Sequence, residues 1–212
     1  MNHIEIVGVS KIIQKVKVLD DINLLLHGGK VYSFQGENGS GKTMLFRVLS
    51  GLSMPTAGEI YYNGIDINKK HQEQFKIGIV LEHASLYPQF TGKQNLRYLA
   101  SINKLIGDVQ IDEALLRVGL DPNDNRTVRK YSLGMRKRLM IAQAIMEKPD
   151  FLFLDEPTNA VDKRGVQKIN NIIRQESERG CCVLLASHIA QDVSAVANHG
   201  YEMDGGRIIS EW

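Results

Sequence analysis

The stretch GENGSGKT, from Gly36 to Thr43, decides the fold of this chain. It fits the spacing G-x-x-x-x-G-K-[ST] and stands between an apolar, β-branched segment and a segment with helical periodicity. Glycines in such a loop let backbone N–H groups turn inward around phosphate oxygens, where a Cβ atom would block their approach. The helix that begins at the loop adds the positive end of its dipole. The sequence therefore predicts a phosphate-binding loop, or P-loop, for a nucleoside triphosphate.

Each position of the P-loop has an expected role. Lys42 is expected to reach the β- and γ-phosphates of the nucleotide, and the hydroxyl of Thr43 is expected to ligate Mg²⁺. The loop and the residue after it are the expected nucleotide contacts: Gly36, Glu37, Asn38, Gly39, Ser40, Gly41, Lys42, Thr43 and Met44.

A second motif, FLFLDE at 151–156, is an apolar strand that ends in two carboxylates. In a P-loop protein Asp155 would hold Mg²⁺, usually through water, and Glu156 would orient and polarise the attacking water. Glu156 need not take a proton early, because phosphoryl transfer depends mostly on positioning and charge stabilisation. Together the two motifs indicate a Mg²⁺-dependent nucleoside triphosphate hydrolase.

A third motif, YSLGM at 131–135, opens a helical segment shortly before the acidic strand. Ser132 is expected to cap that helix, and Gly134 allows close approach of a ligand to the backbone. A helix N-terminus of this kind binds anions. Because the P-loop already supplies a phosphate site, we interpret YSLGM as a site for the nucleotide of a second subunit. Taken alone, the same pentapeptide is also typical of an ordinary capped helix.

Length and composition exclude several classes of protein. The chain has 212 residues, 43% hydrophobic and 24% charged, which is ordinary for a globular domain and rules out a disordered tail, a collagen-like fibre or a disulfide scaffold. A net charge of +2 gives no general attraction to nucleic acid or anionic lipid. The adjacent Cys181 and Cys182 open an apolar run and are expected to be reduced core residues of an intracellular protein.

No apolar run approaches the roughly 20 residues that a membrane-spanning helix needs, and the first ten residues lack the pattern of a secretory signal. If the protein works at a membrane, we expect it to dock onto the helices of another subunit.

Strand and helix patterns alternate along the chain. Strands are predicted within 2–35 (IEIVGV, VKVL, and two strands of DINLLLHGGKVYSFQG joined at Gly28-Gly29), at 76–82, 151–155 and 181–187, and in hairpins at Asn63-Gly64 and Gly205-Gly206. Helices are predicted after the P-loop (Leu45, Val48, Leu49 and Leu52 at helical spacing), from about 84 to 147, at 164–180 and at 189–199. Thr91 and Gln94 predict a capping box. Strands separated by helices imply a parallel sheet with right-handed crossovers.

The order of these motifs resembles that of an ATP-binding-cassette (ABC) nucleotide-binding domain over essentially the whole chain. The P-loop, the strand ending at Glu82, YSLGM, FLFLDEPTNAVD and the Ser-His pair at 187–188 follow one another as in that family. The resemblance implies an α/β fold: a RecA-like P-loop NTPase core with a parallel sheet, an N-terminal antiparallel β part and an inserted α-helical lobe. We expect a single ABC ATPase domain over 1–212, with the core at 1–82 and 149–212 and the lobe at 83–148.

The resemblance also implies roles for individual residues. Ser132, Leu133, Gly134 and Met135 match the signature loop, which acts in trans on the nucleotide of the partner. The segment 159–162 matches the loop after the acidic strand, with Asp162 as its acidic member at the dimer contact. His188 matches the switch histidine that contacts the γ-phosphate. Glu156, His188 and Glu82 are the expected catalytic residues, and Thr43, Asp155 and Glu82 the expected metal-site residues.

Two positions depart from the family pattern. The aromatic residue that usually stacks on adenine is replaced by Ile13, which can cover the base without a π-stack. Glu82 stands where the family usually has glutamine, so a carboxylate could approach Mg²⁺ or the lytic water there. Glu82, the segment ASLYPQFTG and the segment YSLGMRKRL together are similar to a subgroup of exporters acting on antimicrobial peptides, including lantibiotic self-protection and bacitracin-type resistance.

The resemblance implies the ATP-hydrolysing subunit of an ABC transporter, with ATP and Mg²⁺ as ligands. Two copies, or one copy and a paralogue, would close head-to-tail around two ATP and drive a separate transmembrane permease at the cytoplasmic face of the membrane, with no role for nucleic acid. A rival is a soluble, non-transport ABC-type ATPase acting on a macromolecular partner. A tandem cassette, a long coiled-coil insert or a strongly basic face would favour that rival, and the sequence has none of them.

A third reading is a regulatory cassette that does not hydrolyse ATP. It is disfavoured because Lys42, Asp155, Glu156 and His188 are all in place. The basic run 136–138 (Arg136, Lys137 and Arg138) is expected to be a solvated helix face.

Overall fold

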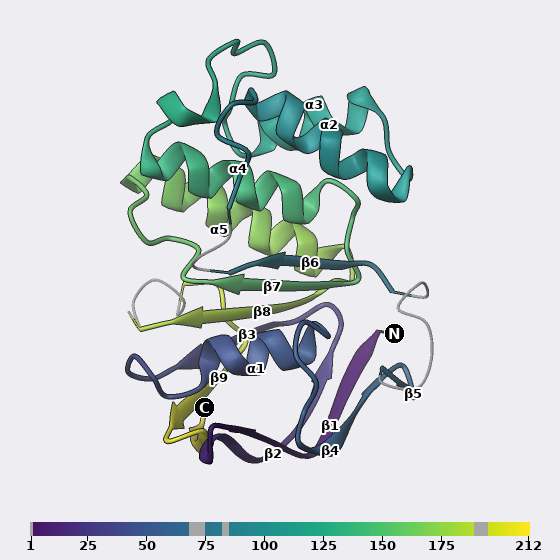
Figure 1. Cartoon of the computed structure of the whole chain (residues 1–212), viewed down its shortest axis with the longest axis vertical. Helices are drawn as coiled ribbons and strands as arrows, with labels where there is room; N and C mark the ends of the chain where they lie inside the picture. The colour runs from purple at the N-terminus through teal and green to yellow at the C-terminus, as the bar shows by residue number, and fades with distance from the viewer. Residues whose placement is uncertain (1, 68–74, 82–84, 189–194) are drawn as a thin grey trace.

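The computed structural model describes residues 2–67, 75–81, 85–188 and 195–212 (Figure 1). The strands are β1 (His3–Ile13), β2 (Val16–His27), β3 (Val31–Gln35), β4 (Ala57–Tyr62), β5 (Ile65–Asp66), β6 (Ile77–Val80), β7 (Phe151–Asp155), β8 (Cys182–Ser187), β9 (His199–Asp204) and β10 (Arg207–Glu211). The helices are α1 (Lys42–Leu49), α2 (Gly92–Asn103), α3 (Asp108–Arg117), the 3₁₀-helix η2 (Val128–Lys130), α4 (Leu133–Ile145) and α5 (Lys163–Glu178).

The larger sheet has six strands in the order β10-β9-β3-β8-β7-β6. Its strands pair in parallel except for β10, which returns antiparallel to β9 through the predicted turn at Gly205-Gly206. Figure 1 shows α4 and α5 on one face of this sheet and α1 on the other. Because parallel strands end at the same edge, the chain segments that follow β3, β7 and β8 meet there.

The smaller sheet is antiparallel, with four strands in the order β2-β1-β4-β5. Helix α1 lies between the two sheets, and its buried residues Leu45, Phe46 and Leu49 belong to one core with residues of both. The ring of Phe46 contacts Phe34 of β3 and Phe153 of β7, with ring centroids 5.7 Å apart in each pair. This packing fixes the start of α1, and with it the P-loop, against the central strands. The predicted parallel core and antiparallel N-terminal part are both confirmed.

Helices α2, α3 and α4 form the upper part of the molecule in Figure 1. Their buried face comprises Leu96 of α2, Ile111 and Leu115 of α3, and Leu139 and Ile141 of α4. The predicted capping box is present at the start of α2: Thr91 accepts from the backbone N–H of Gln94, whose side chain accepts from the N–H of Thr91. Among the described residues, no helix is long and apolar enough to cross a membrane.

The two cysteines agree with the expectation of a reduced core pair. Cys181 and Cys182 are free and buried. Burial raises the pKa of the Cys181 thiol to about 12 and that of Cys182 well above its ordinary value. Since the thiolate is the reactive form, both side chains are inert packing groups at neutral pH.

Three local predictions are wrong. VKVL and DINLLLH form the single strand β2, which pairs with β1 through register shifts. Leu52 is 61% exposed, because α1 ends at Leu49 and the backbone turns at Gly51 with φ of 76°. The helix predicted over 189–199 does not reach its expected end, since 195–198 form turn and bend and β9 begins at His199; residues 189–194 lie outside the described part of the chain.

Candidate active site

The P-loop connects β3 to α1 in the predicted position. Gly36, Gly39 and Gly41 have φ values of 149°, 88° and 110°, in the region that favours glycine. A Cβ atom at Gly36 would collide with the carbonyl oxygen of Met203, whereas one at Gly39 would meet no atom within 4 Å. The loop is therefore packed tightly against β9 at its first glycine and opens at Gly39, where a phosphate can approach the backbone.

The side chain of Lys42 is folded into the P-loop, and Lys42 is only 7% exposed. Its Nζ atom donates hydrogen bonds to the carbonyl oxygens of Gly36 (2.6 Å) and Glu37 (2.9 Å) and to Oγ of Ser40 (3.3 Å). These partners hold the ammonium beside the backbone that would surround a phosphate. A phosphate oxygen forms a stronger, charge-assisted hydrogen bond with it than a neutral carbonyl does.

Thr43 and Asp155 are brought together from opposite parts of the chain. The Oγ1 atom of Thr43 donates a hydrogen bond of 2.7 Å to Oδ2 of Asp155. Hydroxyl and carboxylate oxygens are the hard ligands that Mg²⁺ prefers, and Mg²⁺ is usually bound by one or two carboxylates together with substrate phosphates. No cluster of three or more acidic, histidine or cysteine side chains suited to a metal occurs among the described residues. The oxygens of Thr43 and Asp155 fit a metal that also binds the phosphates of a nucleotide.

Glu156 and His188 join the ends of β7 and β8. The Oε1 atom of Glu156 accepts a hydrogen bond from the backbone N–H of His188 (3.0 Å) and lies 2.8 Å from its Nδ1 atom. The backbone N–H of Glu156 donates to the carbonyl of Ala186 (2.9 Å). Glu156 has φ of 50°, a conformation that costs a non-glycine residue energy and concentrates at functional sites. The His188 side chain is 43% exposed, so its ring remains available to a ligand.

A cavity of about 420 Å³ connects the P-loop with the two carboxylates. It is lined by Val18, Asn38, Gly39, Gly41, Lys42, Thr43, Met44, Arg47, Asp155 and Glu156. The apolar residue from β2 in this lining is Val18. Ile13, the expected cover for the base, ends β1, is 39% exposed and is not among the lining residues.

Arg47 is a lining residue that sequence reasoning missed. It stands four residues after Thr43 on α1, so helical spacing alone places it on the side of the helix that carries Thr43. His188 lines a second cavity, of about 950 Å³, together with Gly36, Glu37 and Asn38. The two cavities thus flank the P-loop, with Asn38 in both linings.

The YSLGM residues lie at the N-terminus of α4. Oγ of Ser132 accepts from the backbone N–H of Met135 (3.2 Å), which confirms the predicted cap. Leu133 is 64% exposed. Within the described part of the chain, the residues that line the P-loop cavity include none of Ser132, Leu133, Gly134 and Met135.

Asp162 caps α5, where it accepts from the backbone N–H of Gly165 (2.8 Å). Glu82 lies outside the described residues, so its expected place beside the metal stays a prediction.

The expected solvated face at 136–138 is wrong for Lys137. This lysine is 6% exposed, and its Nζ donates to the backbone carbonyl of Asp155 (3.1 Å). Arg138 is also engaged, since it donates to the carbonyls of Val118 and Gly119. A signal was present in the sequence: Lys137 stands four residues before Ile141 and eight before Ile145, on the apolar side of α4.

A family model described as "ABC transporter" matches residues 19–159. Among curated proteins, the chain is 42% identical over 205 residues to YybJ, an ABC transporter ATP-binding protein of Bacillus subtilis, covering 97% of this chain and 94% of that one. It is 34% identical to the bacitracin transport ATP-binding protein BcrA of Bacillus licheniformis, covering 98% of this chain and 69% of BcrA. It is 32% identical to the lantibiotic transport ATP-binding protein SrtF of Streptococcus pyogenes, covering 98% and 90%.

Solved structures are similar over the whole chain. The dimeric structure of MJ0796, a bacterial ABC transporter cassette, superposes with a TM-score of 0.90 at 25% identity and covers 99% of this chain and 97% of that one. A dimeric post-hydrolysis state of MJ0796 with ADP and phosphate has the same fold, with a TM-score of 0.90 at 24% identity.

Proposed function

The chain belongs to the ABC transporter family and is an ATP-binding, ATP-hydrolysing subunit of a transporter, and we propose that it powers the export of an antimicrobial peptide. The observation that carries the ATPase assignment is the meeting of Thr43, Asp155, Glu156 and His188 at one edge of the parallel sheet. The peptide class is supported by the bacitracin and lantibiotic transport proteins among its relatives.

The residues of the cavity have different roles in hydrolysis. The P-loop backbone and Lys42 bind the phosphates, and Glu156 orients the attacking water from a position fixed by the backbone N–H of His188. The exposed ring of His188 donates to the γ-phosphate. Thr43 and Asp155 would hold Mg²⁺, which when bound neutralises charge on the phosphates.

The functional unit in this proposal is a dimer. Ser132 caps α4 and does not line the P-loop cavity of its own chain, and the similar cassette MJ0796 has a dimeric structure. We assign Ser132, Leu133, Gly134 and Met135 to the nucleotide of a second copy or a paralogue, and Asp162 to the contact between the copies. In this proposal the whole of 1–212 is one domain, with 83–148 as the lobe.

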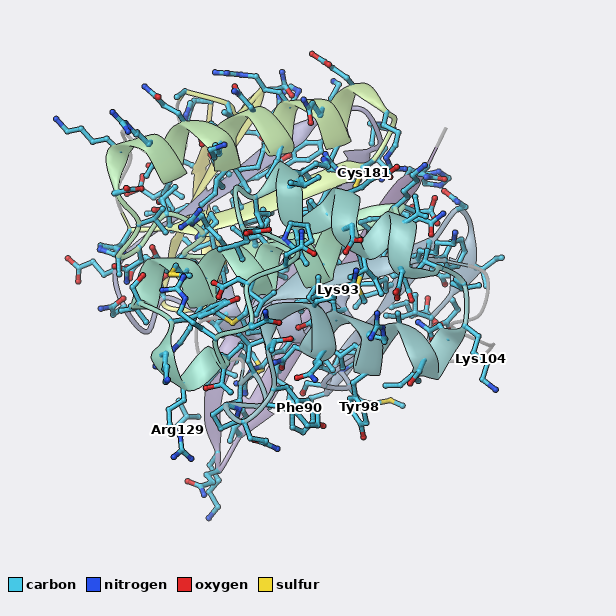
Figure 2. All side chains as sticks on the ribbon, turned by 90° about the horizontal axis from the view of Figure 1, so that it is seen from above. Phe90, Lys93, Tyr98, Lys104, Arg129 and Cys181 are labelled. Atoms are coloured by element: carbon cyan, nitrogen blue, oxygen red, sulfur yellow. The ribbon has the colours of Figure 1, made fainter. Side chains whose placement is uncertain are left out.

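The proposed permease contact is a groove on the helical part of the molecule. Its volume is about 430 Å³, and it is lined by Ser85, Leu86, Pro88, Val128, Arg129, Leu133, Arg136 and Met140. Beside it Tyr87 contacts both Phe90 and Tyr98, with ring centroids 5.5 and 5.0 Å apart. Figure 2, which looks onto this part from above, shows Phe90 and Tyr98 side by side at the edge of the molecule. A groove that combines apolar side chains with two arginines, close to this aromatic group, suits a short amphipathic helix of a membrane subunit at the cytoplasmic face.

The peptide-export proposal is tested in cells that carry the gene with its permease. Deletion of the gene should increase sensitivity to at least one antibiotic in a panel of bacitracin and lantibiotics, and wild-type protein should restore resistance. Protein carrying Glu156→Gln should be produced at the same level without restoring it. Unchanged sensitivity across the panel would contradict the peptide class while leaving the ATPase assignment intact.

A further inference from the structure

Lys137 is a buried lysine next to the two carboxylates that we assign to the metal (Asp155) and to the attacking water (Glu156). It stands on α4, five residues after Ser132, and is 6% exposed. Its Nζ atom donates a 3.1 Å hydrogen bond to the carbonyl oxygen of Asp155, the last residue of β7. Methionine would fill a similar volume without the cost of removing an ammonium group from water, so packing alone does not account for a lysine here.

The hydrogen bond acts on the peptide unit that joins the two carboxylates. The carbonyl of this peptide, on Asp155, accepts from Lys137, and its N–H, on Glu156, donates to Ala186 of β8 (2.9 Å). Both polar ends of the peptide are therefore fixed from different elements. The φ of 50° at Glu156 needs such support, because a non-glycine residue persists in this region only when its surroundings hold it there.

The same side of α4 meets the chain after β7 at a second point. Gly134 precedes Lys137 by three residues, and a Cβ atom at Gly134 would lie 3.1 Å from the carbonyl oxygen of Ala160. Residues three apart on a helix share a face. Helix α4, which Ser132 caps, thus contacts the turn at Asp155 and Glu156 through Lys137 and the following loop through Gly134.

We propose that Lys137 is a positioning residue that sets the turn at Asp155 and Glu156 for ATP hydrolysis and links it to the placement of α4. This inference rests on the proposed function. A second copy that engages Ser132 at the N-terminus of α4 also bears on the helix that holds the Asp155 carbonyl. In each chain, the geometry of the turn at Asp155 and Glu156 then depends on whether the signature residues of the same chain contact the nucleotide of the other copy.

Three variants of the full chain test this role. Lys137→Met removes the donor and the charge, and Lys137→Gln keeps an N–H donor without the charge. Lys148→Met is the matched control, since it makes the same replacement at an exposed position just after the same helix. Phosphate release gives kcat and KM, isothermal titration with ATP in EDTA gives Kd, and the thermal midpoint without nucleotide checks folding.

Lys137→Met should lower kcat by about ten-fold or more with KM and Kd within about two-fold of wild type, because the barrier rises while the phosphate cradle is intact. Lys137→Gln should fall between Lys137→Met and wild type, and Lys148→Met should match wild type. An unchanged kcat in Lys137→Met, or a loss of ATP affinity in step with kcat, overturns the role.

If Lys137→Met does not fold, Lys137→Gln decides: a lower kcat at unchanged Kd supports the role, and a wild-type kcat overturns it. Absence of hydrolysis by wild-type protein contradicts the proposed function instead, so the two failures are distinguishable.

Discussion

The hydroxyl of Thr43 donates a 2.7 Å hydrogen bond to the carboxylate of Asp155, across 112 positions of sequence. The contact joins the first turn of α1 to the end of β7, so the phosphate cradle and the acidic strand form one site. It also preorganises the two oxygens that we assign to Mg²⁺.

Replacing Thr43 with valine should raise the Mg²⁺ concentration needed for half-maximal ATPase activity. Valine has nearly the shape of threonine but no oxygen ligand, and Asp155 loses the hydrogen bond from Thr43. The loss should be larger at low Mg²⁺ than at saturating Mg²⁺. A Mg²⁺ titration of phosphate release measures this. An unchanged Mg²⁺ concentration for half-maximal activity would contradict the assignment of Thr43 to the metal site.

Ser132→Arg should abolish ATPase activity while sparing the affinity of the monomer for ATP, because we assign the signature residues to the nucleotide of the partner. Ser132→Ala is the control: it loses the cap of α4, at a cost of about 0.5–2 kcal/mol in stability, without adding bulk to the dimer contact. In the arginine variant, isothermal titration should show ATP binding as in wild type, whereas phosphate release should show no turnover. A parallel loss of both in that variant would argue for a site in cis.

Ile13→Tyr should strengthen ATP binding by about 0.5–2 kcal/mol, the scale of an aromatic contact with the adenine face. Ile13 is partly exposed at the end of β1, so a larger ring can be accommodated. Titration calorimetry compares the two forms. Unchanged or weaker binding would indicate that the base lies elsewhere, with Val18 of the cavity lining as the residue to change next.

Glu82→Gln should alter basal hydrolysis and its Mg²⁺ dependence if the carboxylate helps to hold the metal or the water. Glutamine keeps the shape and removes the charge. The rate of phosphate release across a Mg²⁺ titration gives the answer. If Glu82→Gln and Glu82→Ala both match wild type, in hydrolysis and in resistance to the peptide that we propose is exported, Glu82 is a solvated carboxylate.

The stability of the fold should decrease as the pH rises above about 9, the ordinary pKa of a thiol. Burial raises the pKa of Cys181 to about 12, so the folded state keeps a proton that the unfolded chain releases. The contribution is complete below the unfolded pKa and is lost as the pH rises toward the folded one. Urea unfolding of wild type and Cys181→Ala from pH 7 to 10.5 should show a steeper decline in wild type; equal slopes would contradict it.

Much of the site could be predicted because its parts are local motifs with matching flanks. The glycine spacing from Gly36 to Gly41 and the apolar run before Asp155 each specify a loop or strand end without knowledge of distant contacts. A parallel sheet then brings those ends together, since its strands end at one edge. Ser132 and Thr91 were predictable as caps for the same reason: each acts within one helical turn.

The features that the sequence did not predict depend on contacts between residues that are distant along the chain or on turns that helical spacing does not show. Lys137 is charged, yet its partner is a carbonyl 18 positions away on β7. Val18 lies in a predicted strand, but its place in the cavity lining depends on how β2 packs beside the P-loop, which the strand pattern alone does not give. Leu52 kept the helical spacing, but the chain had already turned at Gly51.

The ATPase assignment is tested most directly by Glu156→Gln, compared with wild type by size-exclusion chromatography in ATP and Mg²⁺ together with phosphate release. Glutamine keeps an oxygen that can accept from the backbone N–H of His188 but cannot polarise water as a carboxylate does. The variant should bind ATP, hydrolyse it at a small fraction of the wild-type rate and elute as an ATP-dependent dimer. Hydrolysis near the wild-type rate by a variant that stays monomeric in ATP would contradict the assignment of Glu156 as the catalytic carboxylate.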